Sequence, residues 1–327
     1  MNTIICYGLI FLLAFFICTI CTARLIPRLH AMKMGQRILE IGPVWHAKKE
    51  GTPTMGGMAF LFTTALLALL ALPLALRHLT GEEVYLLYLT ILFCIANGAV
   101  GVVDDLTKLR HRSNAGLSPT QKLVLQIALA AAYLALLRLF GVWDNVLQLS
   151  FLGEVPLGFA TFFVLMLLLL GMVNCANLTD GIDGLATTNA AVIYAFFALY
   201  AAHKSAFVPG ALAALALGCA LSFFFFNRYP AKVFMGDTGS LFLGAAAVSL
   251  PLLLHAYLLA LLCGIVYVIE GVSVILQVLY YKLTHKRLFL MAPIHHHFEK
   301  CGWSENKIVA CFSCLTALSC LLCWFLP

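Results

Sequence analysis

The chain has 327 residues, of which 63% are hydrophobic and only 10% are charged, and its formal net charge at pH 7 is +6. A soluble globular domain has about half of its residues apolar and about a quarter charged, so this composition excludes that class. It indicates an integral membrane protein that crosses the bilayer many times. We expect no nucleic-acid partner.

Ten apolar runs approach or reach the length of a membrane-spanning helix, which is about 17–25 residues. The first lacks the basic start and the cleavage site of a signal peptide, so it is interpreted as a span. The eighth is short and carries a glycine and a proline. The sequence therefore predicts an all-α polytopic membrane protein, with residues 1–327 forming one domain. The runs cover residues 4–23, 55–76, 84–103, 123–140, 159–173, 185–202, 210–226, 241–255, 258–281 and 308–325.

The basic residues predict the orientation, because Lys and Arg accumulate in cytoplasmic loops. If the N-terminus lies outside, all but three of the 20 Lys and Arg residues fall on the cytoplasmic side; the exceptions are Arg77, Arg138 and Lys204. Ten spans then place both termini on the extracytoplasmic side. The outer loop 141–158 alternates briefly between apolar and polar residues and predicts a small hairpin.

Polar side chains recur at every third position of the segment 174–185, at Asn174, Asn177, Asp180 and Asp183. On a continuous helix, each step of three residues rotates the side chain by about 60° from the last, so the four would spread over half the circumference. Gly181 and Gly184 indicate instead that the helix ends and the backbone turns here. We therefore expect a polar site just beyond a membrane span.

The pair Asp104 and Asp105 ends another predicted span on the same side. Adjacent carboxylates repel each other and resist desolvation, so they need a cationic partner. A magnesium ion that also binds substrate phosphates is one such partner. A helix cap at the membrane interface is the alternative.

Two glycine-containing loops accompany these aspartates. Residues 48–57, KKEGTPTMGG, combine lysines, threonines and glycines, a pattern that binds phosphate through backbone N–H groups or forms a basic flank with a turn. Residues 234–240, FMGDTGS, set Asp237 among glycines, with Phe234 as an apolar face for a base or an interfacial anchor. Lys122, at the start of the next span, is a phosphate contact or a simple flank.

Three consecutive histidines, His295, His296 and His297, follow the ninth predicted span. They cannot all face one zinc ion from a regular helix, so phosphate or ribose recognition is favoured over zinc. Glu270 lies within the ninth span itself. An acid inside the membrane is a functional candidate by default, although it also pairs helices or relaxes a bend in some proteins.

Together these stretches resemble one family, the bacterial phospho-N-acetylmuramoyl-pentapeptide transferases, which make the first lipid intermediate of peptidoglycan. The similarity covers nearly the whole chain in the family's order. GTPTMGG and HHHFE distinguish it from the wider polyprenyl-phosphate sugar-1-phosphate transferases, which share mainly the aspartate motifs. The matching motifs are GTPTMGG at 51–57, DDLTK at 104–108, NLTDGIDGLA at 177–186, FMGDTGS at 234–240 and APIHHHFE at 292–299.

The resemblance implies a homodimeric, multi-pass protein of the bacterial inner membrane, with its active site facing the cytoplasm. It also implies Mg²⁺ and two substrates, UDP-N-acetylmuramoyl-pentapeptide and undecaprenyl phosphate, which yield lipid I and UMP. Direct attack by the lipid phosphate is favoured over a covalent aspartyl intermediate, because a phosphate monoester has a second pKa of about 6 and needs little help from a base.

Two other functions stay open. A related transferase would use another UDP-sugar, such as UDP-N-acetylglucosamine. A transporter would need a polar path at mid-membrane, which the largely apolar spans disfavour.

The resemblance also assigns roles to individual residues. Asp237 is implied as the magnesium ligand and a catalytic residue, Asp104 as the candidate base toward the lipid phosphate, and Asp105 as its catalytic neighbour. The implied substrate contacts are Lys49, Thr54, Lys108, Lys122, Asn174, Asn177, Asp180, Asp183, Phe234, His295, His296 and His297.

Overall fold

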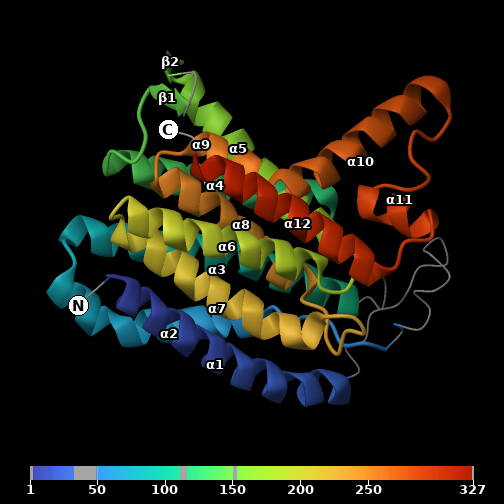
Figure 1. Ribbon diagram of the computed structural model, residues 1–327, viewed down its shortest axis with the longest axis horizontal. Helices are drawn as coiled ribbons and strands as arrows, with labels where there is room; N and C mark the ends of the chain where they lie inside the picture. Colours follow the sequence, from blue (N-terminus) through green and yellow to red (C-terminus); the bar gives the residue numbers. More distant parts are fainter. Residues whose placement is uncertain (1–2, 33–48, 50, 111–115, 150–152, 326–327) are drawn as a thin grey trace.

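The computed structural model describes residues 3–32, 49, 51–110, 116–149 and 153–325, most of which are helical (Figure 1). The helices are α1 (Thr3–Ala31), α2 (Met58–His78), α3 (Gly81–Arg110), α4 (Pro119–Leu139), α5 (Ala160–Thr179), α6 (Leu185–His203), α7 (Phe207–Asn227), α8 (Gly236–Leu253), α9 (Tyr257–Cys263), α10 (Ile265–Thr284), α11 (Ile294–Lys300) and α12 (Glu305–Trp324).

Nine helices in the described part of the chain are long and apolar enough to cross a membrane: α1, α3 to α8, α10 and α12. The described apolar stretch of α2, Met58–Ala71, is shorter. All ten predicted spans are thus helical, and the prediction of an all-α, multi-pass membrane protein is confirmed.

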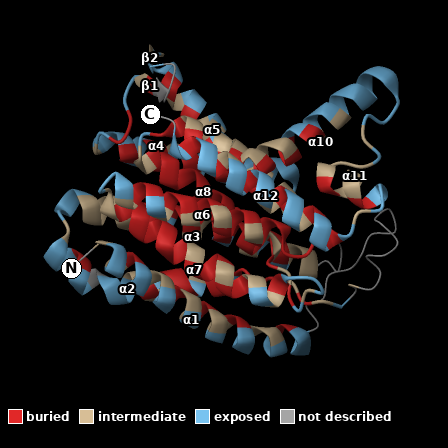
Figure 2. Cartoon of the chain, in the orientation of Figure 1, coloured by how far each residue is buried: buried red, intermediate tan, exposed pale blue. Residues whose placement is uncertain are grey.

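Helix α8 lies at the centre of the bundle, although the sequence marked it as the weakest span. It is buried along most of its length and packs against α3 and α5 (Figure 2). Gly244 permits this packing, because a Cβ atom there would lie within 3.0 Å of Val173 and Ala176 on α5. Small residues at such positions let membrane helices approach closely.

The ninth predicted span is two helices rather than one. Helix α9 ends at Gly264, and α10 projects away from the rest of the bundle (Figure 1). A Cβ atom at residue 264 would meet the Ala260 carbonyl oxygen and the end of the Met172 side chain of α5, so glycine fits best at this break. The histidine stretch forms the short helix α11, which periodicity did not predict.

A two-stranded ribbon forms in the loop where the hairpin was predicted. Strand β1 (Val146–Leu149) pairs in antiparallel fashion with β2 (Gly153–Pro156), and Val146 faces Pro156. The ribbon and both chain ends lie at one end of the bundle (Figure 1). We name the opposite end, where Asp104 and Asp237 lie, the aspartate end. Which end faces the cytoplasm stays a prediction.

The close packing of α8 on α5 can be tested by a substitution at Gly244. We expect Gly244→Ala to lower the melting temperature in detergent, because overpacking a tight contact costs about 1–3 kcal/mol. The matched control is Gly171→Ala on α5, where the added Cβ atom would meet nothing within 4 Å. We expect its melting temperature to be unchanged or slightly higher. Equal melting temperatures for wild type and Gly244→Ala would contradict the packing.

Candidate active site

Side chains from four helices meet at the aspartate end. Asp104 and Asp105 lie near the end of α3, Lys122 in the first turn of α4, Asn177 in the last turn of α5, and Asp237 in the first turn of α8. The sequence stretches singled out separately are therefore brought together by the bundle.

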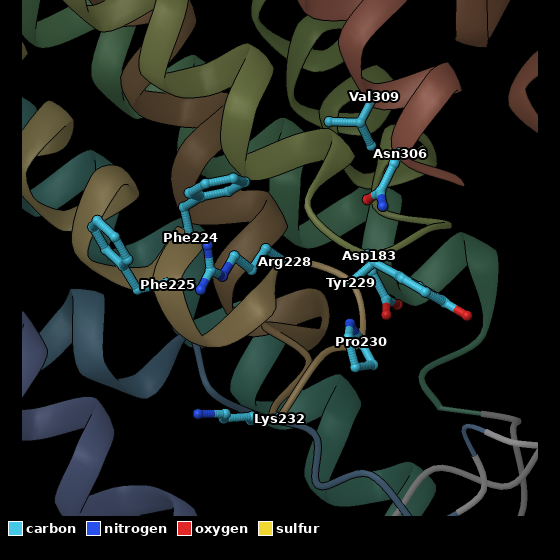
Figure 3. Close-up of a pocket in the computed structure, with 9 residues that line it drawn as sticks. All are labelled: Asp183, Phe224, Phe225, Arg228, Tyr229, Pro230, Lys232, Asn306 and Val309. Atoms are coloured by element: carbon cyan, nitrogen blue, oxygen red, sulfur yellow. The ribbon is translucent and has the colours of Figure 1, made fainter. Parts of the chain in front are cut away.

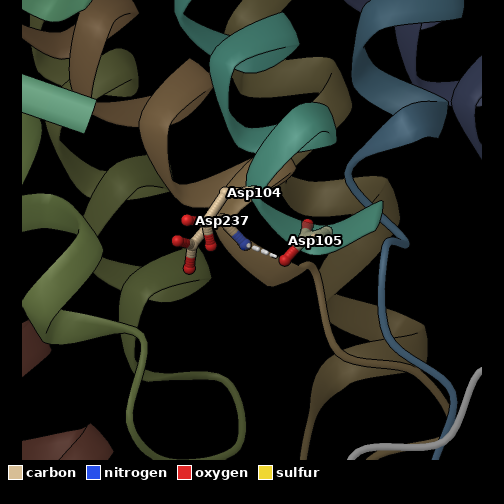
Figure 4. A group of neighbouring side chains, drawn as sticks. All are labelled: Asp104, Asp105 and Asp237. Carbon is tan, nitrogen blue, oxygen red and sulfur yellow. Dashed lines mark hydrogen bonds between the residues drawn. The ribbon is translucent and has the colours of Figure 1, made fainter. Parts of the chain in front are cut away.

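The carboxylates of Asp104, Asp105 and Asp237 form a compact group, which we name the aspartate triad. Each offers an oxygen atom, and these atoms lie within 4.8 Å of one another (Figure 4). Asp104 and Asp105 are 3% exposed, whereas the Asp237 side chain is 18% exposed. Carboxylate oxygens gathered this closely fit a hard cation such as Mg²⁺.

Asp105 differs from its two neighbours, because its carboxylate turns toward the start of α8 (Figure 4). It accepts hydrogen bonds from the Thr238 N–H at 3.0 Å, from the Thr238 hydroxyl at 2.7 Å and from the Asp237 N–H at 3.2 Å. It therefore caps the N-terminus of α8 from another helix, where a negative charge is favourable. The alternative predicted for this aspartate pair, a helix cap, therefore applies to Asp105. The helix that Asp105 caps is α8 and not α3, to which it belongs.

Two lysines balance the charge of the triad. The Lys108 ammonium lies 2.6 Å from Asp104 Oδ2 and 3.2 Å from Asp237 Oδ2. Lys122 Nζ lies 2.6 Å from Asp237 Oδ2 and 3.3 Å from Asn177 Oδ1. Asn177 in turn donates to Asp237 Oδ1 at 3.1 Å. Both lysines thus hold Oδ2 of Asp237, and Asn177 holds Oδ1.

A second charged cluster surrounds Lys49. Its ammonium lies 2.6 Å from both Asp183 Oδ1 and Glu305 Oε2. Glu305 also accepts from the Asp183 N–H at 3.0 Å. The sequence analysis did not identify Glu305. The pattern that could have revealed it is an acidic residue at the start of the last span, directly after the capping residue Ser304.

A cavity of about 400 Å³ adjoins Asp183 instead of the aspartate triad (Figure 3). Arg228 and Lys232 give it a basic side, and aromatic rings give it an apolar side. The residues lining it are Asp183, Phe224, Phe225, Arg228, Tyr229, Pro230, Lys232, Asn306 and Val309.

The two glycine-containing loops pair with each other. The Gly56 N–H donates to the Phe234 carbonyl at 2.9 Å, and the Gly57 N–H donates to the Met235 carbonyl at 3.0 Å. These two amides are therefore occupied, and the interpretation of this loop as a backbone phosphate cradle is wrong for them. Glycine is needed at position 57 because a Cβ atom would overlap the Gly239 backbone.

Two further predicted contacts lie near these clusters without joining them. The Thr54 hydroxyl lies beside Gly236, so it is next to the triad. The Asn174 amide donates to Gln126 Oε1 at 2.9 Å and to the Leu170 carbonyl at 2.8 Å, deeper along α5 than Asn177. Asn174 thus joins α4 to α5 below the triad.

The turn predicted after Asn177 is confirmed. Helix α5 ends at Thr179, α6 begins at Leu185, and Gly184 adopts a φ of 81° that favours glycine. Loss of water on burial, followed by the charges of Asp237 and Asp105, raises the pKa of the Asp180 carboxyl to about 8.

The three histidines point to three different partners. His295 Nδ1 lies 3.0 Å from Glu270 Oε2, and His296 Nδ1 lies 2.6 Å from Glu299 Oε2. His297 Nδ1 accepts from the Leu290 N–H at 3.2 Å. His295 is fully buried, whereas the His296 side chain is 15% exposed.

Comparison with known proteins gives consistent matches. Residues 84–255 match the family model of glycosyl transferase family 4, and residues 49–61 match the phospho-N-acetylmuramoyl-pentapeptide-transferase signature 1. The phospho-N-acetylmuramoyl-pentapeptide-transferase of Clostridium perfringens (strain 13 / Type A) is 40% identical over 316 residues, which are 95% of this chain and 95% of that protein. The proteins of the same name from Clostridium beijerinckii and Bacillus velezensis are 42% and 39% identical over 301 residues, covering 91% and 92% of this chain and 89% and 91% of theirs.

The raised pKa of Asp180 predicts a pH-dependent stability. The pKa of an aspartate in the unfolded chain is about 3.9, so between about pH 4 and pH 8 the folded state binds the proton more tightly. The free energy of unfolding therefore falls as the pH rises through this window. We expect Asp180→Asn, which cannot ionise, to gain melting temperature over wild type, and to gain more at pH 8.5 than at pH 5.

The measurement is thermal unfolding of the metal-free protein in detergent with a chelator. Glu154→Gln in the exposed ribbon is the control, and we expect its difference from wild type to be equal at both pH values. A gain for Asp180→Asn that does not change with pH would contradict the raised pKa.

Proposed function

The chain belongs to the phospho-N-acetylmuramoyl-pentapeptide transferase family, and we propose that it carries out this family's reaction. It transfers phospho-N-acetylmuramoyl-pentapeptide from the UDP-linked precursor to undecaprenyl phosphate. The products are lipid I and UMP, and the reaction is the first membrane step of peptidoglycan synthesis. The observation that carries this proposal is the aspartate triad with its two lysines at the end of an apolar bundle.

The proposed cofactor is Mg²⁺, held by Asp237 and Asp104. Oxygens of all three carboxylates converge, but Asp105 is bonded to backbone and hydroxyl donors at the start of α8, whereas Asp104 and Asp237 pair with the ammonium groups of Lys108 and Lys122. When bound, Mg²⁺ supplies charge neutralisation for the diphosphate and for the departing UMP. Asn177 and Lys122 orient Asp237 from the side.

The proposed chemistry is a single displacement. An oxygen of the lipid phosphate attacks the β-phosphorus of the UDP-sugar, the bond to the bridging oxygen breaks, and UMP leaves with that oxygen. Because the lipid phosphate is already anionic near neutral pH, Asp104 positions it instead of removing a proton. Lys108 and Lys122 reduce the repulsion between the two anionic reactants. A labelled phospho-sugar trapped on Asp104 without lipid would contradict this mechanism.

The nucleotide side of the site is proposed around the Lys49 cluster. Asp183 lines the nucleotide pocket there, Asn177 and Asn174 line the sugar-phosphate side next to the triad, and Phe234 stacks on uracil. The basic and aromatic cavity beside Asp183 supports a charged, ring-containing ligand on this side (Figure 3). The remaining proposed contacts are Lys49, Thr54, Lys108, Lys122, Asp180, His296 and His297, whereas His295 is fully buried and is left out of this set.

The assembly and its orientation belong to the same proposal. Residues 1–327 form one transmembrane transferase domain, the protein is a homodimer in the bacterial inner membrane, and the aspartate end faces the cytoplasm. The accumulation of Lys and Arg in the loops at that side supports this orientation. A water-soluble nucleotide would reach the site from there, while the lipid substrate arrives within the bilayer.

The test is UMP release by the purified protein with UDP-N-acetylmuramoyl-pentapeptide, undecaprenyl phosphate and magnesium. We expect Asp237→Asn to reduce release by at least about a hundredfold, because electrostatic stabilisation at the reacting centre contributes that much or more. A chelator should abolish release in wild type, and added magnesium should restore it. Glu82→Gln, an exposed acid at the other end of α3, is the control and should retain activity.

Three outcomes would contradict this proposal in different ways. Full activity of Asp237→Asn would exclude the triad as the metal site. Release with UDP-N-acetylglucosamine alone would identify a related transferase with another sugar. No release with any nucleotide, from protein that unfolds cooperatively, would exclude a transferase.

A further inference from the structure

Glu270 is an acid within the membrane-spanning helix α10, and none of its side-chain surface is exposed. The same is true of His295 in α11. The two side chains meet at 3.0 Å between Glu270 Oε2 and His295 Nδ1, and the His295 backbone nitrogen lies 3.5 Å from the same oxygen. The buried Glu270 side chain of α10 thus contacts the first turn of α11.

This contact couples the position of α11 to a buried carboxyl group. An acid at this depth is costly unless it is paired, and removing one member of a buried pair leaves the other uncompensated. Helix α11 has only seven residues, too few to be stable in isolation, so its position depends on tertiary contacts. Those contacts include the Glu270–His295 pair and the packing of Ile294 and Phe298 near Ile308 and Phe312.

The other edge of the His295 ring faces the turn between α5 and α6. A Cβ atom at Gly181 would overlap His295 Nε2 and Cε1, so the imidazole lies directly against the backbone of this turn. The turn carries Asp180 and Asp183. The imidazole of His295 is therefore held between α10 and the turn that joins α5 to α6.

We propose that Glu270 is a positioning residue, which fixes α11 and the Asp180–Asp183 turn relative to each other by holding the His295 ring between them. His295 is the link in this arrangement and does not contact substrate. His296 differs from it, because its side chain is 15% exposed and pairs with Glu299 in α11 itself. The kinetic part of this inference rests on the proposed function, whereas the structural part does not.

The structural test is hydrogen–deuterium exchange of the full-length protein in detergent, followed at residues 294–300 and 180–184. We expect Glu270→Ala to accelerate exchange in both segments by about tenfold, the change expected for a lost charge-assisted hydrogen bond. Glu270→Gln keeps an amide group that can accept from or donate to His295 Nδ1 in either tautomer of the ring, so it should stay close to wild type. Gly181→Ala, which pushes the ring away from the turn, should reproduce the acceleration without altering Glu270.

The matched control is Ser273→Ala, which removes another buried polar group of α10. Its hydroxyl donates only within α10, to the Glu270 carbonyl at 2.7 Å, so exchange in α11 should not change. Unchanged exchange in α11 for both Glu270→Ala and Gly181→Ala would overturn the proposal. Equal acceleration in Ser273→Ala would overturn it as well, because the effect would then be general loosening of α10.

The kinetic test separates positioning from loss of folded protein. We expect Glu270→Ala to raise KM for the UDP-linked substrate by about tenfold and to leave KM for undecaprenyl phosphate unchanged, with rescue by Glu270→Gln. A lower rate with both KM values unchanged would overturn the proposal, since it reports only a smaller active fraction. If wild type releases no UMP, the proposed function fails, and the exchange experiment still decides the role of Glu270.

Discussion

Burying three carboxylates at the end of an apolar bundle is the constraint on which the site depends. Each member of the triad meets this constraint differently: Asp104 pairs with Lys108, Asp237 with Lys122 and Lys108, and Asp105 with the N-terminus of α8. These partners belong to three different helices, so no single segment of the chain supplies them all. Neutralising the triad therefore requires α3, α4 and α8 to meet at one point, which links the chemistry of the site to the packing of the bundle.

Close backbone contact makes that meeting possible. A Cβ atom at Gly101 of α3 would overlap the backbone of Asp237, and one at Gly57 would overlap Gly239. Gly101 thus lets α3 approach α8 and places Asp105 within reach of the α8 N-terminus, while Gly57 brings the 51–57 loop onto α8. Their main effect in this chain is to position carboxylates, instead of offering free amides to phosphate. The same geometry explains why α8, the poorest span by sequence, is the most enclosed by its neighbours.

The sequence correctly predicted the features that depend on residues close together in the chain. The ten apolar runs form helices. The backbone turns at Gly184, whose φ of 81° favours glycine. The gathering of acids at one membrane face followed from the positions of span ends and basic residues. What the sequence did not show were contacts between distant segments: the cap that Asp105 gives α8, the pairing of Glu305 with Lys49, and the burial of His295 against Glu270. The break at Gly264 was missed because it lies within a continuous apolar run, residues 258–281.

The central claim is that the triad binds the divalent cation that carries the substrate diphosphate. The most direct measurement is a structure of the protein with Mn²⁺ and the UDP-linked substrate, in which anomalous scattering locates the metal. The account predicts one Mn²⁺ bound directly by carboxylate oxygens of Asp237 and Asp104, with Lys108 and Lys122 turned toward the phosphates and Asp105 still bonded to Thr238. Metal found only at the Lys49 cluster or the histidine helix, with the triad retaining its lysine pairs, would contradict it.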